Sequence, residues 1–319
     1  MKKIVIISGD PNSINSEIIF KSWKKINSSL KKRIFFISNY QVLKQQFKKL
    51  KYNIKMIKIN NLDQAKYSDQ LKILNVDLKF KNPFEVDNKQ ASKFVRNSLN
   101  LAHKLAINKK ICGIINCAID KKLLKNNIGV TEYLANKCNI KNKSEVMLIR
   151  NKNLSVSPIT THINVKNIAK KIKPLTIVNK VKTINSWYKK LFFKKPKIAV
   201  LGLNPHNAEL RKNSEEKKII IPTILKLKNH GINIKGPIVS DTIFMNDFKK
   251  YDVIIGMYHD QVLSPFKALF KFNAINITLG LKYLRISPDH GTAFDLIGKK
   301  KANPLSLIKC INFINKFIK

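Results

Sequence analysis

The fold class is decided by residues 254–295, which read IIGMYHDQVLSPFKALFKFNAINITLGLKYLRISPDHGTAFD. The segment is otherwise apolar and strand-like, and it includes His259, Asp260, Lys267 and Arg285. Its first apolar run gives way to polar groups, as a buried strand does where it ends. Ligands bind at the carboxyl ends of the strands in an open α/β sheet. An ordinary loop would explain any one of these residues, but the whole group favours a functional site.

Alternating strand and helix patterns fill the N-terminal part of the chain. The apolar run 3–8 predicts a strand, and a helix from Asn15 to about Lys25 follows, with Ser16 as its candidate cap. This alternation predicts a parallel sheet covered by helices. The same patterns predict strands at 33–38, 52–59, 111–117, 145–149, 154–163, 197–203 and 251–257, and helices at 41–50, 92–107, 165–187 with a break at Pro174, 215–231 and 304–318.

Length and composition indicate a globular protein of about two lobes. A chain of 319 residues and 36.7 kDa can bury a sizeable core. The sequence contains neither an internal repeat nor a low-complexity linker. We therefore expect the two lobes to be interleaved along the chain and not joined end to end.

The chain is strongly basic. Its 62 lysines and arginines stand against 19 acidic residues, which gives a net charge of +43 and a pI near 10.2. Such a balance raises nucleic-acid binding as an alternative. However, the lysines are spread along the chain with abundant Ile and Asn, as AT-rich codons favour, and no zinc-finger or RNP motif accompanies them. We expect no nucleic-acid partner, but a positive surface would steer anionic substrates.

The cysteines and the N-terminus point to a cytoplasmic protein. The four cysteines lack the paired spacing of a zinc site, so we expect reduced thiols: Cys112, Cys117, Cys138 and Cys310. The first apolar run is too short for a signal peptide. No apolar stretch approaches the ~20 residues of a membrane span, so we expect no membrane partner.

Three histidines end or follow apolar runs: His162, His206 and His259. Neutral imidazoles suit Zn²⁺ and similar ions, and a catalytic site commonly has three protein ligands and an open position. Their wide separation gives no support from spacing, and a single histidine is more often a structural hydrogen-bonding group. Both interpretations stay open on the residues alone.

Lys267 and Arg285 flank the run 276–280 and are candidates for binding a phosphate or carboxylate. The abundance of lysine weakens the case for Lys267. The run 289–292 has polar and backbone groups that suit a cofactor. No GxGxxG follows the first strand, so the Rossmann dinucleotide fingerprint is absent.

Four motifs in order resemble the 4-hydroxythreonine-4-phosphate dehydrogenase family of pyridoxal phosphate biosynthesis. They are GLNPH at 202–206, MYHDQ at 257–261, NITLGL at 276–281 continuing to Arg285, and DHGTAFD at 289–295. Weaker matches extend the resemblance over nearly the full length, at 9–11, 116–121, 131–132, 160–162 and 240–244.

The resemblance implies a two-lobed α/β/α fold like that of isocitrate and isopropylmalate dehydrogenases. One lobe would comprise residues 1–135 with 285–319, and a central lobe, residues 136–284, would carry the metal ligands and dimer contacts. It also implies NAD as hydride acceptor and a homodimer whose active sites draw on both subunits. That fold binds NAD without the Rossmann fingerprint, which agrees with its absence here.

Site residues follow from the resemblance position by position. The ligands of a divalent metal (Zn, Mg or Co) would be His162, His206 and His259, one of them from the partner chain. The substrate-binding residues would be Thr131, Lys267, Asn276 and Arg285. Asp241 and Asp260 are candidates for catalytic or cleft positions. The cofactor-binding candidates are Asn204, Asp289, His290, Gly291 and Thr292.

The implied reaction oxidises the C3 hydroxyl of 4-phosphooxy-L-threonine to a β-keto acid. Loss of CO₂ then yields 3-amino-2-oxopropyl phosphate. The metal would polarise the C3 oxygen. Lys267 and Arg285 would hold the anionic ends of this phosphorylated amino acid, so that the C3 hydrogen faces the nicotinamide.

The chain departs from the family pattern at three places. Val130 replaces a histidine before Thr131, Asn12, Ser13 and Asn15 replace glycines of the N-terminal turn, and NAELR at 207–211 replaces a glycine-rich segment. Loss of glycine restricts how closely backbone can approach a ligand. Three alternatives therefore stay open: a related dehydrogenase for another phosphorylated hydroxy acid, a basic nucleic-acid-binding protein on the same fold, and a non-catalytic homologue.

Overall fold

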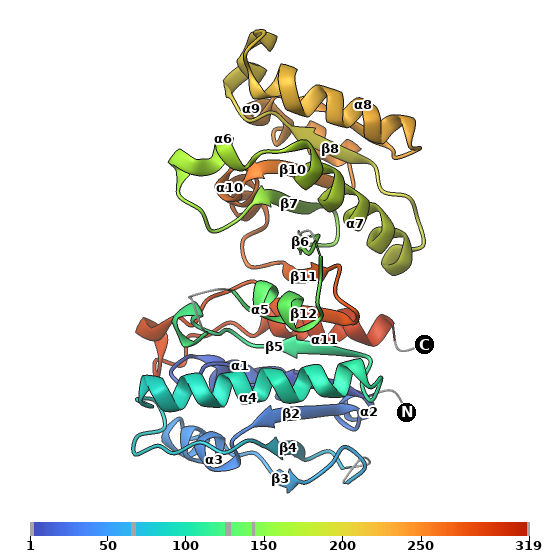
Figure 1. Ribbon diagram of the computed structural model, residues 1–319. Coiled ribbons are helices and arrows are strands. Elements are labelled where there is room, and N and C mark those ends of the chain that lie inside the picture. Colours follow the sequence, from blue (N-terminus) through green and yellow to red (C-terminus); the bar gives the residue numbers. More distant parts are fainter. Residues whose placement is uncertain (1–2, 65–67, 125–128, 142–143, 318–319) are drawn as a thin grey trace. The chain divides into compact units, whose positions relative to one another are not determined.

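The computed structural model describes residues 3–64, 68–124, 129–141 and 144–317 (Figure 1). The chain divides into two compact units. Unit 1 comprises residues 1–138 and 281–319, and unit 2 comprises residues 139–280. The boundaries predicted from the sequence are 135/136 and 284/285.

Unit 1 contains a parallel sheet whose strands are joined in the order β3-β4-β2-β1-β5-β12. Strands buried on both faces are expected to be continuous apolar runs, and β1, β2 and β5 are buried throughout. The strands span Ile4–Ile7 (β1), Ile34–Ser38 (β2), Met56–Ile59 (β3), Leu71–Asn75 (β4), Gly113–Asn116 (β5) and Leu284–Pro288 (β12).

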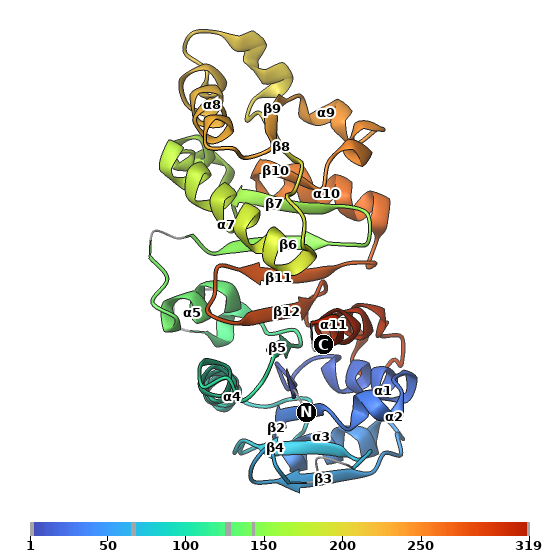
Figure 2. The same ribbon diagram turned by 90° about the vertical axis from the view of Figure 1, so that its right-hand side faces the viewer.

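Helices cover both faces of the unit 1 sheet. Figure 2 shows α4 and α5 on one face and α1 and α11 on the other. Each long helix presents an apolar stripe to the strands, as an amphipathic helix does. The helices of this unit span Asn15–Lys25 (α1), Ser28–Lys31 (α2), Tyr40–Lys49 (α3), Asn88–Ile107 (α4), Val130–Lys137 (α5) and Leu305–Lys316 (α11), with short 3₁₀ turns at Lys121–Leu123 and Phe294–Leu296.

Unit 2 contains a mixed sheet in the order β11-β6-β7-β10-β8-β9. The first three strands pair antiparallel, and β7, β10, β8 and β9 pair parallel. The strands span Val146–Arg150 (β6), Ser155–Thr160 (β7), Ile198–Leu201 (β8), Ile234–Ile238 (β9), Val253–Tyr258 (β10) and Ile275–Leu279 (β11).

The helices of unit 2 also lie on both sides of its sheet, with α7 and α8 on one side and α9 and α10 on the other (Figure 2). Residues of β6, β7, β8 and β10 pack with Val262 and Phe266 of α10 in one buried core cluster. The helices span Ile168–Lys171 (α6), Pro174–Phe192 (α7), Ile221–Asn229 (α8), Ser240–Ile243 (α9) and His259–Phe270 (α10), with 3₁₀ turns at Val165–Asn167 and Asp247–Lys250, a left-handed turn at Pro205–Leu210 and a π-helical turn at Glu216–Ile220.

Most predicted elements are present, with three corrections. Residues 259–270 form helix α10 and are not strand-like, because Val262, Leu263 and Phe266 recur at helical spacing and bury one face. Ser16 does not cap α1, since the N-cap position is Ile14. Strands β4 and β9 were not predicted; β4 contains Lys72, a charged residue that interrupts the apolar pattern yet is fully buried.

Two further features concern the cysteines and the helix lengths. The four cysteines are free thiols, and all but Cys112 are buried. Within the described ranges, no helix is both long and apolar enough to cross a membrane.

Candidate functional site

Three neighbouring parallel strands of unit 2 each lead into one of the predicted metal-binding histidines. Strand β10 lies between β7 and β8. Its register pairs Tyr258 with Thr160, so β7 and β10 end at the same level. His259 immediately follows β10, His162 follows β7 by two residues, and His206 lies in the turn after β8. The topology thus brings the three histidines to one edge of this sheet.

His162 and His259 lie close together, with 5.7 Å between their ring centroids. The Nδ1 of His259 lies 2.6 Å from Oδ1 of Asp260, a contact that orients the ring. Since a Zn–N bond is about 2.0–2.1 Å, two imidazoles at this separation can share one ion. Within the described part of the chain, no group of three histidine, cysteine or acidic residues is arranged to hold a metal.

His206 lies in an unusual left-handed turn. Its φ is 47°, and the next four residues, through Leu210, also have positive φ. Its Nε2 lies 3.7 Å from Oδ2 of Asp241, with both side chains largely exposed. None of these residues is glycine, and the left-handed conformation costs an L-residue about 1–2 kcal/mol. This turn is therefore strained over residues 206–210.

Glu216 holds the start of this turn through hydrogen bonds. Its carboxylate is fully buried and accepts hydrogen bonds from the backbone N–H of Leu203 at 2.7 Å and of Asn204 at 2.8 Å. The Nδ2 of Asn204 donates to Glu216 Oε2 at 3.0 Å and to Glu215 Oε2 at 2.9 Å. Burial raises the pKa of Glu216, but these hydrogen bonds outweigh it and lower the pKa overall. The carboxylate stays charged and fixes the chain just before His206.

In unit 1, Arg285 is the second residue of β12, and its side chain reaches Asn116, the last residue of β5. It is 3% exposed, and its Nε donates to Asn116 Oδ1 at 2.7 Å. Its Nη1 donates to Thr131 Oγ1 at 3.2 Å. Burial lowers the pKa of Arg285 to about 10, so the guanidinium remains charged at neutral pH. The structure therefore brings together two predicted substrate-binding residues, Arg285 and Thr131, and adds Asn116.

A buried carboxylate, Asp10, follows β1 at the carboxyl edge of the unit 1 sheet. Its Oδ1 accepts a hydrogen bond from the Asn12 N–H at 2.8 Å. Burial raises the pKa of Asp10 to about 6. The preceding Gly9 has φ of 79°, and a Cβ at this position would collide with the carbonyl oxygen of Ala118. A glycine is therefore required to start this turn.

The predicted cofactor segment follows β12 in unit 1. The Asp289 N–H donates to Ser306 Oγ at 2.9 Å, and the Ile14 N–H donates to the Thr292 carbonyl at 3.2 Å. His290 Nδ1 lies 2.9 Å from the Gly291 carbonyl oxygen. A Cβ built on Gly291 would meet no atom within 4 Å, so space is open beside this backbone. The segment is anchored at both ends and accessible at its centre.

The remaining predicted residues lie in unit 2. Lys267 is exposed on α10, and Asn276 lies on β11. The Oδ1 of Asn276 is buried and has no hydrogen-bond partner among the described residues. Asn204, a predicted cofactor residue, already donates its amide N–H groups to Glu215 and Glu216.

Sequence reasoning missed Asn116 and Glu216. Asn116 had a usable signal, since it is the last residue of a buried strand. Glu216 had none, because it lies 13 and 12 positions after the residues it holds and inside a predicted helix.

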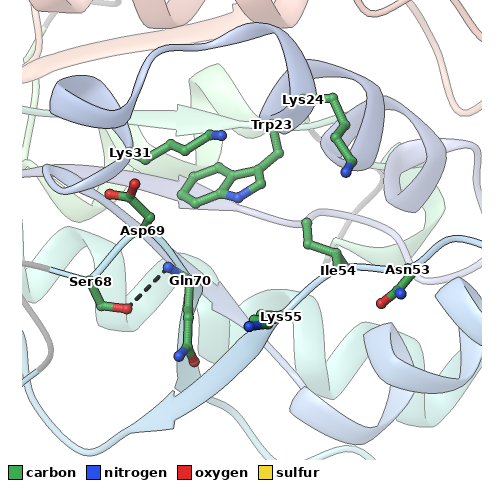
Figure 3. Close-up of a pocket in the computed structure, with 9 residues that line it drawn as sticks. All are labelled: Trp23, Lys24, Lys31, Asn53, Ile54, Lys55, Ser68, Asp69 and Gln70. Carbon is green, nitrogen blue, oxygen red and sulfur yellow. Dashed lines mark hydrogen bonds between the residues drawn. The ribbon is translucent and has the colours of Figure 1, made fainter.

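A hollow of about 510 Å³ lies at the amino ends of β3 and β4 in unit 1 (Figure 3). Figure 3 shows Lys31 and Trp23 on one side and Asp69 and Gln70 on the other. Asp10 follows the carboxyl end of β1, so in this parallel sheet the hollow lies at the opposite edge. No predicted site residue lines it.

Comparison with known proteins identifies close relatives. The family model described as "Pyridoxal phosphate biosynthetic protein PdxA" matches residues 30–314. A 4-hydroxythreonine-4-phosphate dehydrogenase of Sulfurihydrogenibium sp. is 36% identical over 98% of this chain and 97% of its own. A protein of Oceanobacillus iheyensis, provisionally named as a D-threonate 4-phosphate dehydrogenase, is 31% identical over 97% of this chain and 96% of its own.

Solved structures give the same result. The 4-hydroxythreonine-4-phosphate dehydrogenase of Klebsiella pneumoniae has a TM-score of 0.86 at 27% identity, with 100% of both chains covered. The isocitrate dehydrogenase of Methylococcus capsulatus has a TM-score of 0.50 at 11% identity, over 100% of this chain and 86% of its own. The predicted fold class is therefore confirmed.

Proposed function

The chain belongs to the family of pyridoxal phosphate biosynthetic protein PdxA, and from this premise we propose that it oxidises and decarboxylates 4-phosphooxy-L-threonine. A hydride leaves C3 for NAD⁺ and the hydroxyl proton is released, which gives a β-keto acid. The C1–C2 bond then breaks, CO₂ leaves, and C2 keeps the electron pair and takes up a proton. The product is 3-amino-2-oxopropyl phosphate.

One observation carries this proposal: three neighbouring parallel strands lead into His162, His206 and His259, and two of these rings lie 5.7 Å apart. Imidazole donors suit Zn²⁺ and Co²⁺ better than Mg²⁺. A divalent ion held here would polarise the C3 oxygen of the substrate. We propose His206, from this chain or from a second copy in a homodimer, as the third ligand.

The substrate-binding assignment rests on charge and on unmet hydrogen bonding. Arg285 presents a buried guanidinium that Asn116 and Thr131 already orient, so little side-chain freedom is lost when an anion binds. The buried Asn276 Oδ1 is an acceptor suited to the substrate ammonium group. The exposed Lys267 contributes a second cation for the other anionic end.

NAD⁺ is the proposed hydride acceptor, and residues 289–292 are the proposed contact. The support is the open space beside Gly291, between backbone positions that hydrogen bonds hold at Asp289 and Thr292. The homodimer and a cytoplasmic location also remain predictions.

A second substrate is supported by one departure from the family. Val130 stands directly before the substrate-binding Thr131, in place of the family histidine. The Oceanobacillus iheyensis relative carries a name that refers to a different phosphorylated acid. The alternative is therefore a dehydrogenase of the same mechanism acting on another phosphorylated hydroxy acid.

The test is NADH formation by the purified chain with 4-phosphooxy-L-threonine, with product identified by mass spectrometry. We expect turnover that a chelator abolishes and a divalent metal restores. D-threonate 4-phosphate serves as the competing substrate, and a higher kcat/KM for it would select the alternative. Absence of turnover with both substrates under every metal condition would remove the dehydrogenase assignment.

A further inference from the structure

We propose that Gln261 is a positioning residue that fixes the turns carrying His206 and His259 relative to each other for metal binding. The proposal rests on the metal site of the proposed function. It adds a residue that touches neither metal nor substrate and acts through two backbone groups.

Gln261 links the ends of two parallel strands. Its Oε1 accepts a hydrogen bond from the Met257 N–H at 2.7 Å, and its Nε2 donates to the Gly202 carbonyl at 2.7 Å. Met257 lies in β10 two residues before His259, and Gly202 directly follows β8, four residues before His206. The side chain is only 9% exposed, so water competes poorly for these bonds.

The Gln261 side-chain amide continues the hydrogen bonding between β10 and β8 beyond the last backbone pair. Backbone pairing between β10 and β8 runs as far as Ile255 with Val200. Beyond that point the side-chain amide supplies one acceptor to Met257 and one donor to Gly202, as a peptide group of a strand would. Both turns therefore leave the sheet from a fixed separation.

Gly256 provides space for the Gln261 side chain, and Gly202 provides space for Asn207 in the turn after β8. A Cβ at Gly256 would lie 3.0 Å from Gln261 Oε1 and 2.6 Å from Val262 Cγ1. A Cβ at Gly202 would collide with Asn207 Oδ1. Neither glycine has a positive φ, so the requirement at both positions is close approach and not backbone conformation.

Met257 connects the third turn to the same network. The Thr160 hydroxyl donates to the Met257 carbonyl at 2.7 Å, and Thr160 ends the strand before His162. The Met257 residue is thus held through its N–H by Gln261 and through its carbonyl by Thr160. All three histidine-bearing turns are joined through one residue of β10.

The linkage requires an amide. A glutamate cannot donate to the Gly202 carbonyl, and a methionine leaves both the Met257 N–H and that carbonyl unmet in a buried place. If one histidine serves the site of a partner subunit, each metal still takes its ligands from turns that Gln261 holds. Outer partners of metal ligands commonly change metal affinity about 10–100-fold.

The experiment measures Co²⁺ binding to the purified full chain by absorption spectroscopy and competition with a chelator. The variants are Gln261→Glu and Gln261→Met. We expect Co²⁺ affinity to fall about 10–100-fold, with a changed ligand-field spectrum. Hydrogen exchange should become faster at the amides of residues 202–204.

Gln46 provides the matched control. It is a buried glutamine of unit 1 whose Nε2 donates to the carbonyls of Pro11 at 2.8 Å and Pro83 at 2.7 Å. Gln46→Glu and Gln46→Met should lower stability and leave the affinity and spectrum of Co²⁺ unchanged. A merely structural role for Gln261 would make the two sets of variants alike.

Thr160→Val keeps the experiment decisive if the Gln261 variants do not fold. It removes one hydroxyl from the other side of Met257 and should lower Co²⁺ affinity severalfold. Wild-type Co²⁺ binding in the folded Gln261 variants, or in Thr160→Val if those do not fold, overturns the proposal. Failure of the wild-type chain to bind Co²⁺ overturns the metal site itself, and with it this role for Gln261.

Discussion

Polar groups near the carboxyl edges of the two sheets are held in different ways. In unit 1, Asp10 and Arg285, whose side chain reaches Asn116 at the end of β5, are themselves buried and hydrogen-bonded. In unit 2 the side chain of His206 is largely exposed, and that of His259 is partly exposed. The turns that carry them are held by the buried side chains of Glu216 and Gln261.

This difference follows from what each edge is proposed to bind. Asn116 and Thr131 each accept a hydrogen bond from the buried guanidinium, and its low exposure strengthens attraction to an anion. A metal ligand must leave one nitrogen accessible, so it is oriented by contacts elsewhere: Asp260 Oδ1 contacts the Nδ1 of His259, and buried side chains such as Glu216 and Gln261 hold the turns. Unit 1 is thus preorganised in its side chains and unit 2 in its turns.

The largest expected effect comes from removing a proposed metal ligand of unit 2. His259→Ala should lower kcat/KM by about 10³-fold, since charge stabilisation by a metal is worth several kcal/mol. The control is His230→Ala, an exposed histidine at the end of α8 whose Nδ1 contacts the Lys226 carbonyl. Steady-state kinetics and metal content should separate the two variants; equal losses would refute a specific role for His259.

The next effect concerns the buried side chain of unit 1. Arg285→Lys keeps a charge but loses the planar fork that reaches Asn116 and Thr131 together, at a cost of about 1.5–3 kcal/mol. We expect kcat/KM to fall roughly 10–100-fold, mainly through KM. Arg33→Lys, which loses a 3.1 Å bond to Asn315 in the same unit, should retain wild-type kinetics. An unchanged KM in Arg285→Lys would exclude substrate contact there.

Burial in unit 1 should also appear as a pH dependence of stability. The pKa of Asp10 rises from 3.8 to about 6 on folding, so the folded state keeps its proton longer than the unfolded state. The free energy of unfolding therefore falls as pH rises from about 4 to about 6, by on the order of 3 kcal/mol, and is level above that range. Below about pH 4 both states are protonated and the penalty vanishes.

Asp10→Asn removes this titration. Denaturant unfolding at a series of pH values should show that the variant gains stability over wild type across the same window. Asp77→Asn, at an exposed carboxyl of the same unit, should keep the wild-type slope. A wild-type slope in Asp10→Asn as well would show that other groups cause the pH dependence.

The smallest effect tests strain in a turn of unit 2. Glu209 is exposed with φ of 45°, and its ion pair with Arg211 at 3.6 Å contributes little. Glu209→Gly should be more stable than Glu209→Ala by about 1 kcal/mol, because only glycine adopts this conformation without penalty. The two variants differ only in Cβ, so equal melting temperatures would show that the turn is not strained.

The sequence by itself determined the fold class and where the candidate site residues stand along the chain. Continuous apolar runs marked strands such as β1 and β8, and polar residues at their ends marked the carboxyl edges. These features are local, and hydrophobic periodicity records them directly. The family motifs added roles for the same residues, which periodicity alone does not give.

Only the tertiary structure decided how those residues are held. The strand β4 could not be predicted, because a lysine is not expected in a buried strand. Lys72 is tolerated there because its ammonium group donates to the carbonyls of Lys31, Lys32 and Ser68. Gln261 reaches a carbonyl 59 positions away, and Arg285 reaches an amide 169 positions away. The spacing of residues along the sequence does not predict such contacts, since a hydrogen bond across a sheet depends on which strands become neighbours. That choice is made by the packing of the whole chain.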